Sequence, residues 1–223
     1  MTTKELLHYY IKKKFKNRIM ITSSFGAESI VILHLCSRIE PNIPILFLNT
    51  GKLFTATLTY LHKVKKLLKL TNIKIYEPSK QDLQIHDPTG KLHLTNPNLC
   101  CNIRKVLPLK TALKEGNYKA WINGRKRFHG ITRDKLKKVE YVDGICKINP
   151  LADWSFKQLT NYCDYYKLPK HPLVAKGYMS IGCEPCTSKT KDSIRDGRWS
   201  QSLKTECGIH ESKKENEKFY PTN

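Results

Sequence analysis

Thiol groups dominate the chemistry that this sequence offers. Its last quarter holds a C-x-x-C pair, Cys183 and Cys186, and a further cysteine, Cys207, near the chain end. Far upstream, Cys100 and Cys101 occupy adjacent positions. Four thiols in two pairs are a ligand set for a zinc ion or a four-iron four-sulfur cluster. Because neighbouring cysteines reach different irons more easily than one tetrahedral ion, the spacing favours a cluster, with zinc or unrelated thiols as alternatives.

Cys207 has the surroundings of a reactive thiol. Lys204 and His210 flank it, and Arg195 and Arg198 precede it closely in the chain. Positive neighbours favour the thiolate, which is the nucleophilic form of cysteine. The sequence therefore makes Cys207 a candidate nucleophile, and an ordinary cysteine of the chain end is the alternative.

Alternating strand-like and helix-like segments must position these groups. Apolar and β-branched runs predict five strands, at 18–21, 43–48, 73–76, 120–122 and 146–149. Helical spacing of apolar residues predicts helices at 3–16, 27–39, 54–70, 103–114 and 155–166. The alternation predicts an α/β fold with a doubly wound, mainly parallel sheet of about five strands. Residues 78–99 show no clear periodicity and are predicted to form a long loop over the site.

Small polar residues follow the first two predicted strands. Residues 23–26 lead from a strand into a helix, where backbone N–H groups and the helix dipole favour an anion. Residues 48–51 follow the next strand in the same way. Because ligands of doubly wound sheets bind at the carboxyl ends of the strands, these two segments predict a nucleotide crevice.

Composition limits the classes of partner. The net charge of +21 raises the question of nucleic acid, but 32 of the 40 basic residues are lysines, which indicates a bias spread over solvated surface. No nucleic-acid partner is therefore expected. No apolar run is long enough to span a bilayer, and the N-terminal stretch has an amphipathic pattern without the apolar core of a signal peptide, so a cytoplasmic protein is predicted. In that compartment eight cysteines favour ligands and catalytic thiols over disulfides.

Eight motifs in order resemble those of the assimilatory adenylyl-sulfate reductases, a branch of the adenylyl-sulfate/phosphoadenylyl-sulfate reductase family. They are SSFGAES (23–29), FLNTGKLF (47–54), CCNIRKVLPL (100–109), WINGRKR (121–127), INPLADW (148–154), SIGCEPCT (180–187), GRW (197–199) and KTECGIH (204–210). The resemblance covers about residues 21–210. It implies an adenine-nucleotide-binding domain related to the pyrophosphatase-loop enzymes, here residues 1–203, and a flexible catalytic tail, residues 204–223.

The resemblance also implies a role for each matching residue. It places the nucleotide against Ser23, Ser24, Phe25 and Gly26, and its adenosine part against Leu48, Thr50 and Gly51. It makes Cys100, Cys101, Cys183 and Cys186 the ligands of a 4Fe-4S cluster. It places Lys105 between the cluster and the substrate anion, sets Arg127, Arg195 and Arg198 on the phosphosulfate, and makes Cys207 the nucleophile. Asn49 and Lys126 depart from the usual Asp and Arg of the family. Lys126 keeps the charge but loses the planar fork of arginine, so the anion-binding role is given to Arg127.

The implied activity is thiol-dependent reduction of adenylyl sulfate to sulfite and AMP through an S-sulfocysteine on Cys207, in sulfate assimilation and cysteine biosynthesis. A thioredoxin or glutaredoxin-like reductant is implied, and the pattern is compatible with a homo-oligomer. Reduction of phosphoadenylyl sulfate by the same route is the nearest alternative. A pyrophosphatase-loop enzyme of tRNA thiolation and a zinc-stabilised nucleic-acid-binding module are the others.

Overall fold

A six-stranded sheet forms the centre of the molecule, in the order β3-β2-β1-β4-β6-β5. The computed structural model describes residues 1–130, 133–200 and 204–211. The strands are β1 (Ile19–Thr22), β2 (Ile45–Leu48), β3 (Ile73–Tyr76), β4 (Ala120–Ile122), β5 (Val139–Val142) and β6 (Ile145–Ile148). All neighbours are parallel except β5, which is antiparallel to β6. The predicted α/β fold with a mainly parallel sheet is confirmed.

Strand β5 is the one strand in the described chain that the sequence analysis missed. It reaches β6 through a tight turn at Asp143 and Gly144, both with left-handed backbone (φ 49° and 78°). An Asp-Gly dipeptide between two strand-like segments is a strong hairpin signal, because both central residues of that turn need positive φ. Because the predicted pattern contained only strands that alternate with helices, it did not include this hairpin.

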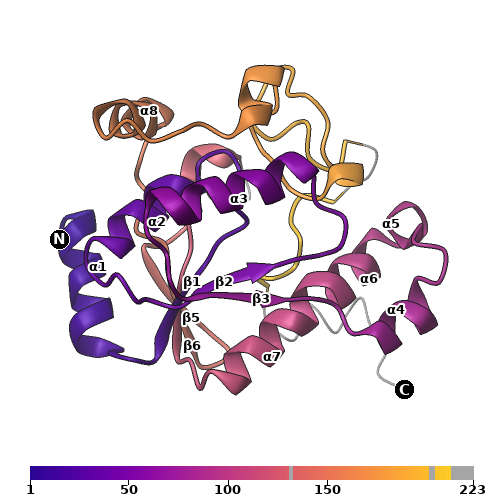
Figure 1. Cartoon of the computed structure of the whole chain (residues 1–223), viewed down its shortest axis with the longest axis horizontal. Helices are drawn as coiled ribbons and strands as arrows, with labels where there is room; N and C mark the ends of the chain where they lie inside the picture. Colours follow the sequence, from indigo (N-terminus) through magenta and orange to yellow (C-terminus); the bar gives the residue numbers. More distant parts are fainter. Residues whose placement is uncertain (131–132, 201–203, 212–223) are drawn as a thin grey trace.

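The two faces of the sheet bury different side chains, because successive residues of a strand point to opposite sides. One face packs under four helices, α1 (Thr3–His8) with its π-helical continuation to Lys14, α2 (Ser29–Ser37), α3 (Thr55–Leu67) and α8 (Phe156–Tyr165). The other face packs Met20, Leu46 and Trp121 against α7 (Leu107–Glu115). Helices therefore cover both faces, as the doubly wound prediction requires (Figure 1).

The prediction of a long loop at residues 78–99 is wrong. This segment forms three short helices, α4 (Lys80–His86), α5 (Leu92–Thr95) and α6 (Pro97–Cys101), and α6 continues through a π-helical turn into α7. The side chains of Ser79 and Asn96 cap two of them, each accepting a backbone N–H at 3.0 Å. Because α4 and α5 bury no side chain, no apolar periodicity marked them in the sequence. None of the helices in the described part has the length and apolar character needed to cross a bilayer.

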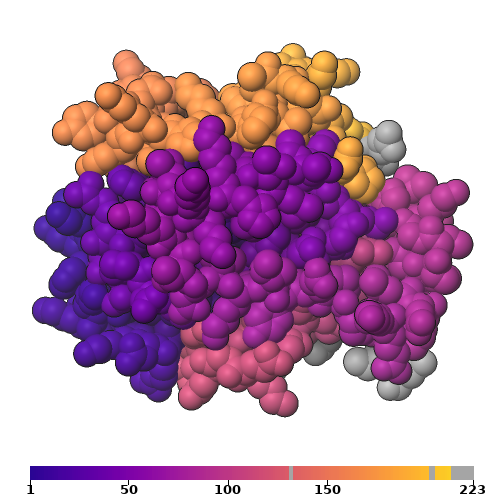
Figure 2. Space-filling model, in the orientation of Figure 1, coloured from indigo at the N-terminus to yellow at the C-terminus, as the bar shows by residue number. Residues whose placement is uncertain are grey.

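A buried histidine fixes the segment that leads from α8 to the C-x-x-C pair. His171 Nδ1 accepts the backbone N–H of Leu173 at 3.2 Å, so the proton of the neutral ring lies on Nε2, 3.1 Å from Thr57 Oγ1 on α3. Its ring also packs on Tyr60, with centroids 4.8 Å apart. Figure 2 shows the orange residues after α8 lying against the purple residues of α3. These contacts hold the segment around His171 against α3.

Burial lowers the pKa of His171 to about 4, so we expect its contribution to stability to depend on pH. Below about pH 6.5 the unfolded chain binds a proton that the folded ring does not accept, so stability falls until about pH 4. The loss reaches at most about 3 kcal/mol. Urea unfolding between pH 7 and 4 should show this loss in the native chain and a smaller one in His171→Gln. Parallel pH dependences would contradict it.

Candidate active site

A cavity of about 230 Å³ opens at the carboxyl ends of the parallel strands. Residues that follow β1, β2 and β4 line it, and β1 lies between the other two strands in the sheet. The chain after β1 turns to one side of the sheet and the chain after β3 crosses to the other, so this is the switch point at which doubly wound folds bind ligands. A cavity therefore lies where the sequence predicts a nucleotide crevice.

The loop after β1 presents its two serines to the cavity and its aromatic residue to the core. Ser23, Ser24 and Gly26 line the cavity, whereas Phe25 is fully buried and packs edge-on against Phe47. A left-handed backbone at Phe25 (φ 48°) makes this division possible. Its N–H bonds to Ser23 Oγ at 3.2 Å. The predicted nucleotide contact of Phe25 can therefore involve only its backbone.

The end of β2 joins the cavity to the cysteines. Leu48 and Thr50 line the cavity, and Gly51 does not, because it forms the left-handed turn that follows (φ 68°). Thr50 Oγ1 lies 3.3 Å from Cys183 Sγ, and the Thr50 carbonyl accepts Arg104 Nη1 at 2.6 Å. Buried Arg104 also pairs with Asp87 at 2.6 Å. Thr50 thus contacts both the cavity and one of the four cysteines, Cys183.

Positively charged side chains surround the cavity. Arg195 and Arg198, both predicted from the sequence, line it together with Lys105. Arg127 is absent from the lining: its Nε donates to the Leu136 carbonyl at 2.9 Å and its other end pairs with Asp153 at the surface. Its neighbour Lys126, which the sequence analysis left without a role, lines the cavity instead.

Lys126 is held in place by an acidic partner. It pairs with Glu28, which also lies 3.0 Å from His129 Nε2. Burial opposes ionisation of Glu28, but Lys126 and His129 outweigh it and lower the pKa of this carboxyl to about 2. Sequence spacing gave no sign of this arrangement, because Glu28 and Lys126 are brought together only by the pairing of β1 with β4.

The arginines of the GRW motif region are also preorganised. The guanidinium of Arg198 packs over the Trp199 ring, 4.2 Å from its centroid, and against Gly182, where a Cβ atom would overlap it. Arg195 Nη2 donates to the Thr205 carbonyl at 3.0 Å. Burial and the neighbouring Arg133 lower the pKa of Arg195 to about 10, so it remains charged at neutral pH. Both side chains are poised for an anion.

The four predicted ligand cysteines come together beside the cavity. Cys100, Cys101, Cys183 and Cys186 line one small hollow, although two of them lie on α6 and two on the loop after residue 180. That loop is fixed on both sides, since Glu184 N–H bonds to the Lys52 carbonyl at 2.8 Å and Trp199 N–H to the Cys186 carbonyl at 3.1 Å. The fold alone therefore gathers the four thiols.

The arrangement of the four cysteines bears on the kind of metal group that they could hold. In the described part of the chain no three His, Cys, Asp or Glu side chains meet closely enough to hold one metal ion. The thiolates of a four-iron cluster each bind a different iron, so they need not converge on one point. Lys105 lies against the thiols, and although burial opposes its charge, Cys183, Cys101 and Cys207 outweigh it and raise its pKa. A cation there suits a group that adds negative charge.

The thiols differ in their tendency to ionise. Burial raises the pKa of Cys100 to about 12 and that of Cys101 to about 11. At Cys183 burial acts in the same direction, but Lys105, the Thr50 hydroxyl and Arg198 outweigh it and lower the pKa. Burial also raises the pKa of Cys186, so Cys183 is the thiol of the four that the protein best prepares as a thiolate ligand.

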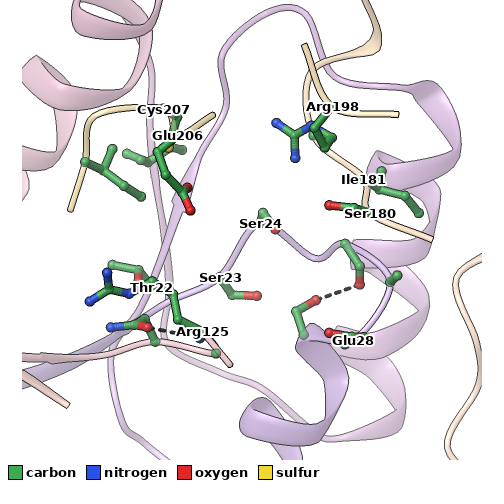
Figure 3. A pocket seen from close by; sticks show the side chains of 18 of the residues that line it. Thr22, Ser23, Ser24, Glu28, Arg125, Ser180, Ile181, Arg198, Glu206 and Cys207 are labelled. Carbon is green, nitrogen blue, oxygen red and sulfur yellow. Dashed lines mark hydrogen bonds between the residues drawn. The ribbon is translucent and has the colours of Figure 1, made fainter. Parts of the chain in front are cut away.

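The candidate nucleophile lies at the same cavity. Cys207 is half-buried and lines it, together with its neighbours Glu206, Ile209 and His210. In Figure 3, Cys207 and Glu206 lie on one side of the cavity and Arg198 and Ser180 on the other, with Ser24 between them. Residues 204–211 of the predicted flexible tail thus pack against the domain, and residues 212–223 lie outside the described residues.

Comparison with known proteins shows the family of this chain. A family model described as the phosphoadenosine phosphosulfate reductase domain matches residues 18–189, more than half of the chain. The chain belongs to the phosphoadenosine phosphosulfate reductase family. The adenosine 5′-phosphosulfate reductase of Mesorhizobium japonicum is 42% identical over 208 residues, which are 92% of this chain and 81% of that protein. The enzyme of the same name from Bacillus cereus is 39% identical over 203 residues, 89% and 86% of the two chains.

Solved structures share the fold of this family member. The phosphoadenylyl-sulfate reductase of Candida auris, solved as a phosphate complex, has a TM-score of 0.72 and 27% identity, covering 85% of this chain and 91% of its own. The NH3-dependent NAD synthetase of Campylobacter jejuni has a TM-score of 0.53 and 19% identity over 74% and 71% of the chains, a likeness of fold alone. The predicted family, fold and enzyme class, a sulfonucleotide reductase, are confirmed.

Proposed function

We propose that the protein reduces adenylyl sulfate to sulfite and AMP, with Cys207 as the nucleophile. The observation that carries this proposal is that Cys207 opens onto the same cavity as the serines after β1 and the arginines Arg195 and Arg198. An anionic nucleotide and a thiolate repel each other, so a site that brings them together needs fixed positive charge. The names of the relatives support this substrate and its place in sulfate assimilation.

Substrate binding uses the residues after the strands. The nucleotide phosphate lies on the backbone N–H groups and hydroxyls of Ser23 and Ser24, and the adenosine part lies along Leu48 and Thr50. The sulfate end meets Arg195, Arg198 and Lys126, whose role here replaces the one first predicted for Arg127. Lys105 stands between this end and the cysteine quartet.

The reaction proceeds in two thiol steps. The Cys207 thiolate attacks the sulfur of adenylyl sulfate, an S–S bond forms, and AMP leaves with the electron pair of the broken S–O bond. A thiolate of a dithiol reductant then attacks the Cys207 sulfur, and sulfite leaves with the electron pair of the S–S bond. The second thiol of the reductant resolves the mixed disulfide and restores Cys207. Because Cys183 and Cys186 are assigned as ligands, the dithiol is external, a thioredoxin-like protein.

The cofactor is a 4Fe-4S cluster held by Cys100, Cys101, Cys183 and Cys186. Bound there, it fixes α6 to the C-x-x-C loop and contributes to the electrostatic field in which Lys105 meets the substrate anion. The two thiol steps account for both electrons of the reduction. A cytoplasmic location suits the eight cysteines, none of which forms a disulfide here.

The preference of the enzyme between the two nucleotides tests the proposed substrate directly. Turnover with adenylyl sulfate should exceed turnover with its 3′-phosphorylated form, measured as sulfite released with a dithiol protein as the reductant. Faster turnover of the 3′-phosphorylated nucleotide would instead give the chain the substrate named for the Candida auris structure. ATP consumption in the presence of tRNA would favour the thiolation alternative.

We expect Gly182→Ala to impair substrate binding without destabilising the fold. The added methyl group overlaps the Arg198 guanidinium, the far end of a flexible side chain, which swings away from the cavity at little cost. Losing one charge-assisted hydrogen bond should lower kcat/KM roughly tenfold to a hundredfold. Steady-state kinetics and a thermal melt check this. Arg198→Gln should cause a similar loss, and combining the two changes should add little; additive losses would contradict the explanation.

A further inference from the structure

The residue immediately before the nucleophile forms an ion pair with two arginines of the cavity. Arg133 Nε donates to one carboxylate oxygen of Glu206 at 2.5 Å, and Arg133 Nη2 to the other at 2.9 Å. Arg195 Nη2 lies 3.4 Å from the second oxygen. The side chains of Glu206 and Arg133 are only 19% and 9% exposed. A bidentate, largely buried ion pair of this kind fixes the positions of its two side chains better than a surface ion pair does.

A second contact holds the chain on the other side of Cys207. Lys147 of β6 is buried, and its ammonium donates to the His210 carbonyl at 2.8 Å while lying over the Trp121 ring. The His210 ring meets the same tryptophan edge-on, with centroids 5.8 Å apart. Ile209 packs against the apolar cluster that contains Trp121.

These contacts lie on the face of the sheet that α7 also covers. On the second face of the sheet α7 packs over β2 and β3. Trp121 and Lys147 lie on that same face of β4 and β6, where residues 209–210 contact them. Residues 209–210 therefore extend the cover that α7 gives to this face onto Lys147 and the neighbouring side of Trp121. Left-handed backbone at Gly208 (φ 85°) turns the chain between the two contacts.

We propose that Arg133, Glu206 and Lys147 are positioning residues that hold Cys207 at the cavity from both sides. The Arg133–Glu206 pair fixes the residue before the nucleophile, and Lys147 with Trp121 fixes the chain three residues after it. None of the three needs to touch the substrate. This inference rests on the proposed function of Cys207, but the contacts themselves are independent of the reaction.

A rival explanation of the same ion pair predicts opposite results. Glu206 carboxylate could serve as a stand-in for the substrate anion, neutralising Arg195 until the nucleotide displaces it. Removing its charge would then free Arg195 and tighten binding of AMP and sulfate. If Glu206 is an anchor, the same change leaves AMP binding nearly unaltered and misplaces the thiol.

The test compares Glu206→Gln, Arg133→Gln and the double variant in the cluster-loaded full chain. We expect each to slow single-turnover sulfonation of Cys207 by roughly 10- to 100-fold, because small misplacements of a reacting group have effects of that size. The double variant should be no slower than either single one, since both break one interaction. The proposal would be overturned if the rate losses of the two single variants multiplied in the double variant. Tighter AMP binding by Glu206→Gln would overturn it as well.

Alkylation of Cys207 by iodoacetamide separates this inference from the proposed function. It needs no substrate, so it reports thiol position even if adenylyl sulfate is not the substrate. We expect several-fold faster labelling of Cys207 in Glu206→Gln and in Lys147→Met, quantified by peptide mass spectrometry. Lys12→Gln, which removes the half-buried Lys12–Glu40 pair, neither residue of which lines the cavity, is the matched control and should label like the native chain. Unchanged labelling in both variants would refute the anchor, and a thermal melt identifies any variant that is merely unfolded.

Discussion

Replacing Cys207 with serine is expected to abolish sulfite formation and to prevent any sulfonate adduct on the protein. Without the thiolate no S–S bond can form to the substrate sulfur, and a serine hydroxyl is a far weaker nucleophile at neutral pH. Loss of a covalent nucleophile costs roughly 10⁴-fold or more in turnover. Nucleotide binding should persist, because the cavity residues around Ser23, Ser24 and Arg198 are untouched.

The measurement is intact-protein mass spectrometry after mixing with adenylyl sulfate in the absence of reductant. The native chain should gain the mass of one sulfonate, located on the peptide that contains Cys207, and release one AMP. Cys207→Ala should behave like Cys207→Ser, which separates the missing thiol from any effect of the hydroxyl. A sulfonate on Cys183 or Cys186 while Cys207 is unmodified would overturn the assignment.

Replacing Cys183 with serine should remove the metal centre and, with it, activity. Cys183 is the buried thiol whose pKa the surrounding Lys105, Thr50 and Arg198 lower, so it is the ligand that the site prepares best. We expect protein purified without oxygen to lose its brown colour and most of its iron. We also expect a lower midpoint of thermal unfolding, because the cluster joins α6 to the C-x-x-C loop.

Cys163→Ser is the matched control for that experiment. Cys163 is a half-buried cysteine of α8 that does not line the hollow formed by the four cysteines, so its replacement should leave iron content and activity near native values. Iron analysis and visible absorption give the answer without an activity assay. A colourless native protein with one zinc per chain would refute the cluster, and Cys183→Ser with full iron would remove Cys183 from the ligand set.

Several structural predictions succeeded because they depended on local chemistry. Continuous apolar runs such as Ile45–Leu48 can be satisfied only in a sheet covered on both faces, and polar residues directly after them must then lie at one edge. This reasoning brought Ser23, Ser24 and Thr50 to one cavity. The spacing of the cysteine pairs likewise indicated one shared site, which the small hollow lined by all four supports.

Other features escaped the sequence because no local pattern encodes them. The motif favoured Arg127 over its neighbour Lys126 as the anion-binding residue. Only the direction of the chain after β4 sends Lys126 into the cavity and Arg127 to Asp153. Helices α4 and α5 bury no side chains, so apolar periodicity could not reveal them. For Lys126 and Arg127 the deciding contacts are with residues distant in the sequence. For α4 and α5 there is no buried side chain that could mark the helix.

By itself the sequence determined which groups can react: a lone thiol among cations, four further thiols in two pairs, and hydroxyls after a strand. Residue type fixes these properties, so they survive without knowledge of the fold. The tertiary structure decided which groups act together. It joined Glu206 to Arg133 and the His210 carbonyl to Lys147, and so held the nucleophile between them. Those pairs span 73 and 63 residues, and only the packing of the sheet brings such distant positions within hydrogen-bond reach.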